Sequence, residues 1–408
     1  MSDQFKSGLG ELSKERSLYP QESLLKARSK KNSLQIGIPK ETAFQENRVA
    51  LTPDSVALLV NNGHEVIVEH KAGKKSKFED SEYAEAGAKI GFANSEIFQS
   101  DIVLKIEPPT HEEIELIKKG AVLISALQIG NQKVEYLNAL MEKKITAIGF
   151  ELLEDKAGGM PIVRAMSEIS GNVALPIASE YLNSFNEGNG IIIGGVTGVP
   201  PTKIVILGAG TVAEYAARAA LGLGAEVQVF SNHIYKLRRI RQMLGQQIYT
   251  ASLDTVTLTE SLKSADVVIG AIRAEKGRTK VVVSEEMVMA MKPNSVIIDV
   301  SIDQGGIFAT SEITTHDKPV FRKHDVIHYC VPNIASRVAR TATTAFSNIF
   351  TPILLRVADE GDINDMIFNH KWFMRGVYIY RGSLTNYMVA QKFNLKCKDL
   401  NLLLAARY

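Results

Sequence analysis

Lys203-Ile-Val-Ile-Leu-Gly-Ala-Gly-Thr-Val-Ala213 places an apolar strand, a glycine turn and the start of a helix in one continuous run. Gly208 permits the tight turn, Gly210 lets the backbone approach a pyrophosphate, and Ala213 allows the helix to pack closely on the strand. The helix N-terminus adds unpaired N–H groups and the positive end of a dipole. The run predicts a dinucleotide-binding α/β domain whose cofactor contacts include Gly208, Gly210, Thr211 and Val212.

The second strand of this unit is expected at 226–230, and the residue that follows it bears on cofactor choice. An Asp or Glu there would bind both ribose hydroxyls, but this chain has Ser231. A serine makes fewer contacts and does not repel a 2′-phosphate. Asn232, His233, Arg238 and Arg239 follow, although the two arginines are also what a solvated helix face would carry. NAD is therefore the expected cofactor, and NADP is not excluded.

Short apolar runs alternate with amphipathic stretches along most of the chain, which predicts parallel βαβ units in sheets covered on both faces. Strands are expected at 34–38, 65–68, 101–106, 121–127, 146–150, 203–207, 226–230, 266–272, 295–301 and 326–331. Helices are expected at 53–62, 111–119, 133–143, 167–186, 212–221, 235–244 and 337–360, the last broken near Pro352 because proline removes a backbone donor.

These patterns predict an α/β protein with two doubly wound domains, one of them a Rossmann domain, linked by long helices with a cleft between them. The expected division is a polar N-terminal extension (1–33), a discontinuous substrate domain (34–165 plus 335–408) and the Rossmann domain (166–334). The tail at 371–408 is rich in aromatic and aliphatic residues, so it is expected to pack on the first domain or on a neighbouring subunit.

Composition excludes several classes of protein. The 408 residues carry 47 Lys and Arg against 45 Asp and Glu, a formal charge of +2, so no uniform field favours nucleic acid. Two cysteines, Cys330 and Cys397, are too few for a disulfide framework, and no metal site is expected. The polar N-terminus does not resemble a secretory signal, and no apolar run approaches the roughly 18 residues of a membrane span. The chain is expected to be cytoplasmic, without a membrane or nucleic-acid partner.

Six segments resemble the family of alanine dehydrogenases and the NAD(H)-binding subunits of proton-translocating transhydrogenases. They occur in the family's order at 36–42, 47–53, 166–171, 194–199, 302–306 and 329–333, with the sequences IGIPKET, NRVALTP, MSEISG, GGVTGV, IDQGG and YCVPN. The Asp303-Gln-Gly-Gly306 segment resembles alanine dehydrogenases more than transhydrogenases.

The resemblance implies an active-site cleft between the domains and reversible, NAD-dependent oxidative deamination of L-alanine to pyruvate and ammonium. It implies that Arg48 holds the substrate carboxylate, a role that suits a planar guanidinium in a loop between a strand and a helix. Asp303 matches the family's essential aspartate near the reacting centre. The resemblance places six further residues in the dinucleotide site: Ser167, Ser231, Ile272, Val300, Val331 and Asn333. It also implies a homo-oligomer, a hexamer or a dimer.

Two positions depart from the family's pattern, and both concern catalysis. The family's Lys-x-Lys-Glu-Pro segment, whose second lysine contacts the substrate, reads Lys105-Ile-Glu107-Pro108 here. Lys105 therefore matches that lysine with a shift of one residue, or Glu107 replaces it. Because residues i and i+2 share one face of a strand, both side chains are expected to project to the same side. The family's acid/base histidine falls at Gln128, which cannot exchange a proton near neutral pH. Asp303, Glu107 or a water held by Gln128 is then expected to transfer the proton.

Three interpretations follow from these residues. The first is an amino-acid dehydrogenase of the alanine dehydrogenase type, acting on alanine or on another amino acid. The second is a soluble NAD(H)-binding subunit of the transhydrogenase type, which does not need the histidine. The third is a nucleotide-binding or sensing protein that has lost its acid/base group. Oxidation of an amino acid distinguishes the first interpretation from the other two.

Overall fold

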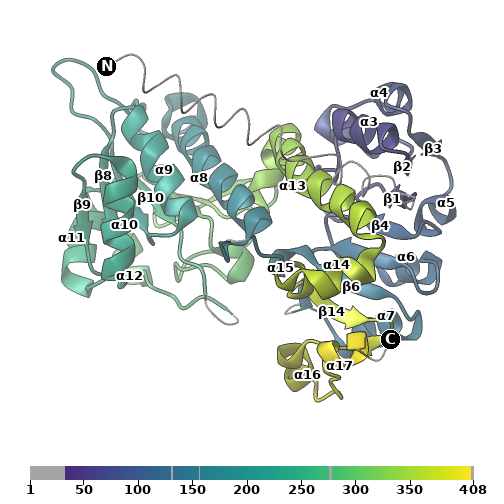
Figure 1. Cartoon of the computed structure of the whole chain (residues 1–408). Helices are drawn as coiled ribbons and strands as arrows, with labels where there is room; N and C mark the ends of the chain where they lie inside the picture. Colours follow the sequence, from purple (N-terminus) through teal and green to yellow (C-terminus); the bar gives the residue numbers. More distant parts are fainter. Residues whose placement is uncertain (1–32, 130–131, 156, 275–277, 406–408) are drawn as a thin grey trace, which may run out of the picture.

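The chain folds around two separate β-sheets joined by long helices, and this arrangement confirms the predicted α/β class (Figure 1). The structure is a computed structural model that describes residues 33–129, 132–155, 157–274 and 278–405. The predicted extension at 1–33 lies almost wholly outside the described residues. In Figure 1, the purple, blue and yellow parts of the chain surround the first sheet, and the teal and green parts surround the second.

The first sheet has eight strands in the order β15-β14-β6-β5-β4-β1-β2-β3. Its strands are β1 (Gln35–Ile38), β2 (Glu65–Glu69), β3 (Lys89–Gly91), β4 (Ile102–Leu104), β5 (Val122–Ser125), β6 (Thr146–Gly149), β14 (Val377–Tyr380) and β15 (Ser383–Leu384). The first six pair in parallel, while β14 runs antiparallel to both β6 and β15. The C-terminal tail thus completes the sheet that the N-terminal half begins, which is the first of the two packing sites expected for it.

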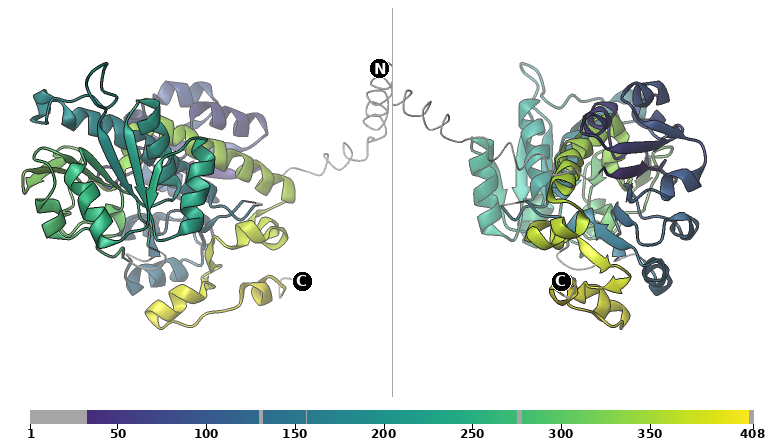
Figure 2. Two further views of the ribbon diagram at one scale, coloured as in Figure 1. Left: turned by 90° about the vertical axis from the view of Figure 1, so that its left-hand side faces the viewer. Right: turned by 45° about the vertical axis from the view of Figure 1, so that its right-hand side comes forward.

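The second sheet has seven strands in the order β12-β13-β11-β10-β7-β8-β9. Its strands are β7 (Lys203–Leu207), β8 (Glu226–Phe230), β9 (Tyr249–Ala251), β10 (Val267–Gly270), β11 (Val296–Asp299), β12 (Val320–Lys323) and β13 (Val326–Tyr329). Only the edge strand β12 is antiparallel. Helices lie on both sides of this sheet in the left view of Figure 2, as expected for a doubly wound fold.

The helices cover the sheets and connect them. Those of the first sheet are α3 (Pro53–Asn61), α4 (Asp80–Glu85), α5 (Asn94–Phe98), α6 (His111–Leu116), α7 (Val134–Glu142), α14 (Ile363–Asn369), α15 (Lys371–Met374), α16 (Tyr387–Phe393) and α17 (Leu400–Ala405). Those of the second are α9 (Thr211–Gly222), α10 (Ile234–Leu244), α11 (Thr255–Ser264) and α12 (Glu285–Met289). The connecting helices are α8 (Pro161–Leu182) and α13 (Ala339–Glu360), and short 3₁₀ turns include η5 (Ile302–Gln304) and η6 (Ile334–Val338).

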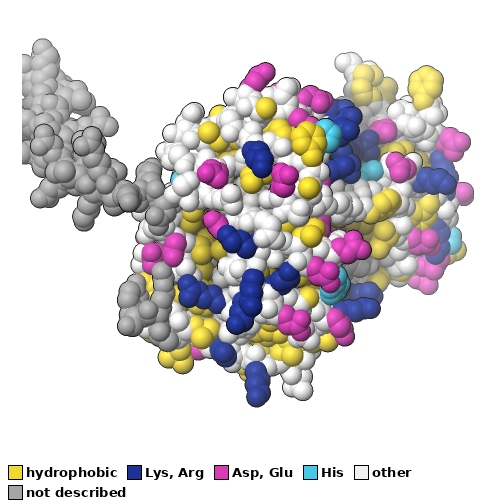
Figure 3. All heavy atoms as spheres, turned by 90° about the vertical axis from the view of Figure 1, so that its right-hand side faces the viewer, with side chains coloured by type: hydrophobic (Ala, Val, Ile, Leu, Met, Phe, Trp, Pro, Cys, Tyr) yellow, Lys and Arg dark blue, Asp and Glu magenta, His cyan; other side chains and the backbone are white. Residues whose placement is uncertain are grey.

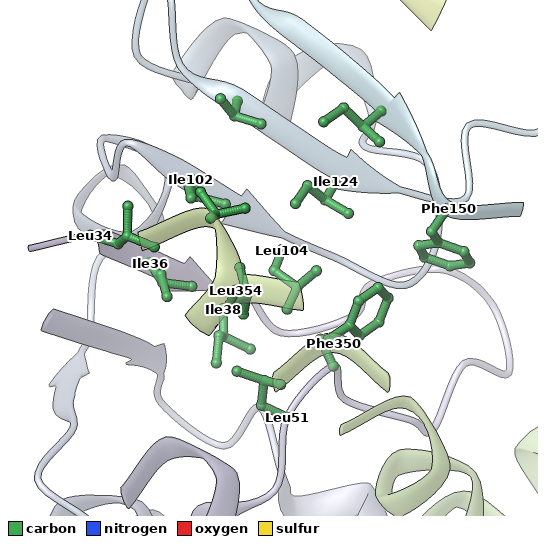
Figure 4. Close-up of a cluster of buried hydrophobic side chains, with 14 of the residues drawn as sticks. Leu34, Ile36, Ile38, Leu51, Ile102, Leu104, Ile124, Phe150, Phe350 and Leu354 are labelled. Carbon is green, nitrogen blue, oxygen red and sulfur yellow. The ribbon is translucent and has the colours of Figure 1, made fainter. Parts of the chain in front are cut away.

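The core of the first part forms where α13 lies against the sheet. Figure 4 shows Ile36, Ile38 and Leu104 of the central strands facing Phe350 and Leu354 of α13, and all five are buried. Burying an aliphatic or aromatic side chain of this size stabilises the fold by about 1.5–3 kcal/mol. The contact fixes α13 against β1 and β4, so the loops that leave these strands have a rigid base.

Two predictions about the long helices are wrong. Helix α13 continues through Pro352 and ends only at Glu360, so the predicted break is absent. Helix α8 begins at Pro161 rather than at residue 167, because proline is favoured in the first helical turn, where its missing N–H costs nothing. The proposed domain boundary at 165/166 falls inside α8, and that at 334/335 falls inside η6. The domain limits therefore stay a prediction.

The surface is mixed in charge. On the face shown in Figure 3, acidic and basic side chains are interspersed among apolar ones, in agreement with the small formal charge of the chain. None of the helices that the structure describes is long and apolar enough to cross a membrane.

Both sheets have the same strand order around their first strand, and this determines where a site can form. In each sheet, successive strands are added on one side of the first strand and then, from the fourth strand on, on its other side, so the strand order reverses at β1/β4 and at β7/β10. Ligands of open α/β sheets bind at this switch point, outside the carboxyl ends of the strands. The residues that follow β1, β4, β7 and β10 therefore lie where a ligand would bind.

Candidate active site at the carboxyl ends of the strands

Polar side chains gather where three neighbouring strands of the first sheet end. Glu46 and Arg48 follow β1, Glu107 follows β4, and Gln128 follows β5. The backbone of the Arg48 loop is held by α13, because the hydroxyl of Thr343 accepts from the N–H of Val49 (3.1 Å). The site therefore rests on the same helix that anchors the core.

Arg48 is buried, with 6% of its side chain exposed. Its Nε donates to Oε1 of Glu46 (2.7 Å) and its Nη2 to Oε2 of the same carboxylate (2.5 Å), a two-point pair. The guanidinium also lies 5.3 Å from the ring centre of Phe346. Burial alone would lower the pKa of Arg48, but the carboxylates of Glu46, Glu107 and Glu41 together outweigh burial and raise it. Arg48 is therefore a fixed cation, and among the described residues its Nη1 has the sulfur of Met166 as its hydrogen-bond partner, at 3.4 Å.

Glu107 joins Arg48 to Gln128. Its Oε1 lies 3.5 Å from Nη2 of Arg48, and its Oε2 accepts from the side-chain amide of Gln128 (2.7 Å). Burial, followed by the nearby charge of Glu46, raises the pKa of Glu107 to about 7. Glu107 can consequently exist in either protonation state near neutral pH, which is what a proton-transfer group requires.

Gln128 itself occupies an uncommon backbone conformation. Its φ is +45°, in the left-handed region that non-glycine residues seldom adopt. The carboxylate of Glu151 accepts from the N–H groups of Leu127 (3.3 Å) and Gln128 (3.1 Å) and from the hydroxyl of Tyr378 (3.3 Å). Glu151 thus holds the turn that presents the Gln128 side chain to Glu107.

Asn333 links this cluster to the second sheet. It adopts φ +54° just after β13, its side-chain amide donates to Oε2 of Glu46 (2.8 Å), and its backbone N–H donates to Oδ1 of Asp303 (2.9 Å). The Asp303 carboxylate is open to solvent, although the protein around it partly displaces water and raises its pKa. The structure thus connects Asp303, Asn333, Glu46, Arg48, Glu107 and Gln128 into one chain of contacts.

The structure does not bring Lys105 to this chain. Strand β4 ends at Leu104, although backbone hydrogen bonds to the β5 segment continue at Lys105 and Ile106, so the shared face of Lys105 and Glu107 stays a prediction. The Lys105 side chain is 1% exposed, and its Nζ pairs with Glu41 (2.7 Å) and Glu113 (3.6 Å). It is a buried structural cation beneath the cluster.

The glycine turn of the second sheet fits a dinucleotide. Gly208 has φ +122°, and a Cβ there would lie 2.3 Å from the carbonyl oxygen of Ala271, so only glycine can make this turn. A Cβ on Gly210 would meet nothing within 4 Å, which leaves open space beside the first residues of α9, Thr211 and Val212. That space, next to free helical N–H groups, is where a pyrophosphate binds in this type of unit.

The other residues expected in the dinucleotide site follow the same edge. Ser231 follows β8, Ile272 follows β10, Val300 follows β11 and Val331 follows β13, while Ser167 lies on α8, which packs tightly on α9 at Gly171. The hydroxyl of Ser231 accepts from the N–H of His233 (3.2 Å) and is partly engaged. The N–H of Ile272 donates to the hydroxyl of Ser301 (3.0 Å), which fixes that loop. No group of three or more His, Cys, Asp or Glu suited to a metal ion occurs among the described residues.

Two residues that the sequence interpretation did not select are part of the site. Glu46 stands two positions before Arg48, so the opposite charges at close spacing were a visible signal. Glu151 gave no such signal, because it lies 23 residues from Gln128 in sequence and meets it only through the sheet. Glu46 holds the guanidinium of Arg48, and Glu151 holds the backbone of Gln128.

Comparison with known proteins agrees with this geometry. The family model described as "Alanine dehydrogenase/PNT, N-terminal domain" matches residues 37–170, and "Alanine dehydrogenase/PNT, C-terminal domain" matches residues 174–387. "Alanine dehydrogenase 2" of Staphylococcus aureus (strain USA300) is 37% identical over 368 residues, covering 90% of this chain and 98% of that protein. "Alanine dehydrogenase" of Staphylococcus epidermidis (strain ATCC 12228) is 38% identical over 364 residues, covering 89% and 98%.

Solved structures give the same result. A structure of L-alanine dehydrogenase superposes with a TM-score of 0.83 at 33% identity, covering 88% of this chain and 99% of that one. A transhydrogenase from Sinorhizobium meliloti superposes with a TM-score of 0.74 at 24% identity, covering 87% and 99%, and this match bears on the fold alone.

Proposed function

Because the chain belongs to the alanine dehydrogenase/PNT family, we propose that it catalyses the reversible, NAD-dependent oxidative deamination of L-alanine. The amino acid, water and NAD⁺ give pyruvate, ammonium, NADH and a proton. The observation that carries the proposal is the chain of contacts from Asp303 to Gln128, because it joins a fixed cation and two carboxyl groups to the edge that carries the glycine turn.

We assign Arg48 to the substrate carboxylate. Glu46 occupies Nε and Nη2, so the carboxylate would approach Nη1, where the sulfur of Met166 is only a weak acceptor. A buried donor without a strong acceptor is costly, and a carboxylate oxygen would satisfy it. Gly208, Gly210 and the N-terminus of α9 would hold the NAD pyrophosphate. NAD, when bound, accepts the α-hydrogen of the substrate with its electron pair.

Proton transfer falls to Asp303 and Glu107. Asp303 lies on η5 at one end of the chain of contacts, where the N–H of Asn333 donates to its Oδ1. Glu107 changes protonation near neutral pH, and Gln128 orients it. Together these two carboxyl groups can take a proton from the attacking water and return one to the departing ammonia, the role that a histidine serves elsewhere in the family.

The test is formation of reduced cofactor from L-alanine and NAD, with the reverse reaction from pyruvate, ammonium and NADH. Arg48→Lys removes the planar fork while keeping the charge, and should raise KM for alanine by about tenfold or more. The matched control is Arg340→Lys, because Arg340 also lies over a phenylalanine ring, that of Phe78 at 4.2 Å, but outside the site. Binding of NAD without turnover of any amino acid would overturn the proposal and favour a sensing or transhydrogenase-type role.

We further propose a homo-oligomer, a hexamer or a dimer, in the cytoplasm. The segment between α8 and β7 exposes four large apolar side chains, Phe185, Ile192, Val196 and Val199, which supports a subunit contact there. Cys330 and Cys397 are both free thiols, which fits a reducing compartment.

A further inference from the structure

A pocket of about 360 Å³ lies beside Glu107 on the side of α6 and α7. It is lined by Glu107 itself together with Ala43, Pro108, Pro109, Thr110, His111, Gln132 and Tyr136. Its size is at the lower end of the range of about 300–1,000 Å³ that small-molecule sites have. Because Glu107 lies 3.5 Å from Arg48, a substrate held by Arg48 would have this pocket within reach of its side chain. The methyl group of alanine would leave it empty.

Tyr136, one of the residues that line the pocket, carries a buried hydroxyl without a partner among the described residues. Tyr136 is 4% exposed, and its Oη makes no hydrogen bond with any described residue. Its ring packs edge-to-face on that of His111, which also lines the pocket, with the ring centroids 6.1 Å apart. A buried hydroxyl without a partner costs stability, and native structures seldom keep one without a reason. A ligand group in the pocket would supply the missing partner.

The charges around the pocket favour a cation. Glu107 forms part of its lining, and Glu113 lies just behind it, accepting from the N–H of Thr110 (2.8 Å). Glu41 lies beyond, and Lys105 is the cation that pairs with Glu41 and Glu113. Burial raises the pKa of the Tyr136 hydroxyl, and the negative charges of Glu151 and Glu113 raise it further. The hydroxyl oxygen is thus a neutral acceptor in a field that carboxylates dominate.

We propose that this pocket is a side-chain subsite for α-amino acids whose side chain ends in an ammonium group, such as lysine or ornithine. The proposal rests on the proposed function, since it takes the α-carboxylate to lie on Arg48. The side-chain ammonium donates to Oη of Tyr136 and is attracted by Glu107, while Pro108, Pro109 and Ala43 contact the methylene groups. An acidic side chain such as that of glutamate is repelled.

The experiment compares L-lysine with L-norleucine, which has the same carbon chain without the ammonium, and with L-alanine and L-glutamate. We expect kcat/KM with NAD to be at least about tenfold higher for lysine than for norleucine, because a hydrogen bond from a charged group is worth about 1.5–3 kcal/mol. Glutamate should be the poorest of the four.

Tyr136→Phe removes only the unpaired hydroxyl, so the variant should fold. In it, the ratio of kcat/KM for lysine to that for norleucine should fall by about tenfold. Tyr387→Phe is the matched control, because Tyr387 is 64% exposed on α16 and does not line the pocket. A rise in Tm with lysine, larger than with norleucine and reduced in Tyr136→Phe, gives a readout that does not depend on turnover.

The outcomes separate the two proposals. If alanine is oxidised but lysine is no better than norleucine, the subsite is wrong and the dehydrogenase function stands. If no amino acid is oxidised, the proposed function fails, and the subsite then stands or falls on the Tm shift with lysine. A lysine preference that is unchanged in Tyr136→Phe would also overturn the subsite.

Discussion

Replacing Glu107 by Gln should stabilise the protein at alkaline pH and remove a pH-dependent step from the reaction. The ordinary pKa of a glutamate is 4.5, and burial with the neighbouring Glu46 raises that of Glu107 to about 7. Between these pH values the folded protein holds the proton that the unfolded chain has lost, so the contribution of Glu107 to stability falls as the pH rises. Above about pH 7 the folded state bears the whole cost of the charge.

The size of the effect follows from the same values. The difference between about 7 and 4.5 corresponds to about 3 kcal/mol of the free energy of unfolding. The pKa of about 7 already includes the attraction of Arg48, whose guanidinium lies 3.5 Å away, so no separate correction for losing this contact is needed. Glu107→Gln should therefore be more stable at pH 8 by about 3 kcal/mol, or roughly 6–12 °C in Tm. Near pH 5 the gain should be lost.

The assays are thermal unfolding at pH 5 and pH 8 and the pH profile of kcat/KM for L-alanine. The wild type should show a rising limb near pH 7 as Glu107 loses its proton, and Glu107→Gln should lack this limb. Glu85→Gln, at an exposed position on α4, is the control and should leave both measurements unchanged. A Tm difference that is equal at both pH values, together with an unchanged limb, would refute the reasoning.

Further predictions concern the cofactor and the reaction. Gly210→Val should fold, because its Cβ meets nothing within 4 Å, but should weaken NAD binding at least about tenfold by filling the pyrophosphate space. Gly208→Ala should instead lower the free energy of unfolding by about 1–3 kcal/mol through backbone strain, and calorimetry distinguishes the two variants. Ser231→Asp should sharpen the preference for NAD over NADP, and a wild type that already rejects NADP by more than about 10³ would show that other groups set it. Asp303→Asn should reduce kcat by about 10²–10⁴ with NAD affinity nearly intact, and full turnover would exclude Asp303 from proton transfer. Gln128→His should move the acid limb of kcat/KM toward that of an imidazole, and an unchanged profile would show that the ring does not reach the substrate.

The sequence predicted the central strands and the glycine turn well, because both depend on local signals. An apolar run that leads into Gly208 has few other solutions, and strands β7 and β8 have the predicted limits. Edge strands such as β3, β9 and β15 were missed, since they have two or three residues and no distinct apolar run. The break predicted at Pro352 is absent because packing of Phe350 and Leu354 on the first sheet outweighs the loss of one helical hydrogen bond.

The site was harder to predict, because its geometry depends on where strands stop and on contacts between distant residues. The ammonium group of Lys105 pairs with Glu41, whereas the carboxylate of Glu107 contacts Arg48 and Gln128, and no local pattern predicts these partners. The left-handed turn at Gln128 depends on Glu151, and the bridge to the second sheet depends on Asn333 reaching Glu46 across 287 residues of sequence. No local pattern contains such contacts.

Glu46 explains how one arginine can serve as a substrate anchor in a site with several carboxylates. By holding Nε and Nη2, it fixes the orientation of Arg48 before any substrate arrives, and a fixed charge loses less entropy on binding than a mobile one. Its own charge, however, offsets much of the positive field of the guanidinium, and Glu107 adds to this effect when ionised. Affinity for the substrate carboxylate must then come from the directed N–H groups at Nη1 rather than from net charge. A neutral zwitterion or an amino acid with an additional cation fits such a site better than an acidic amino acid does, so Glu46 and the pocket at Tyr136 point to the same class of substrate.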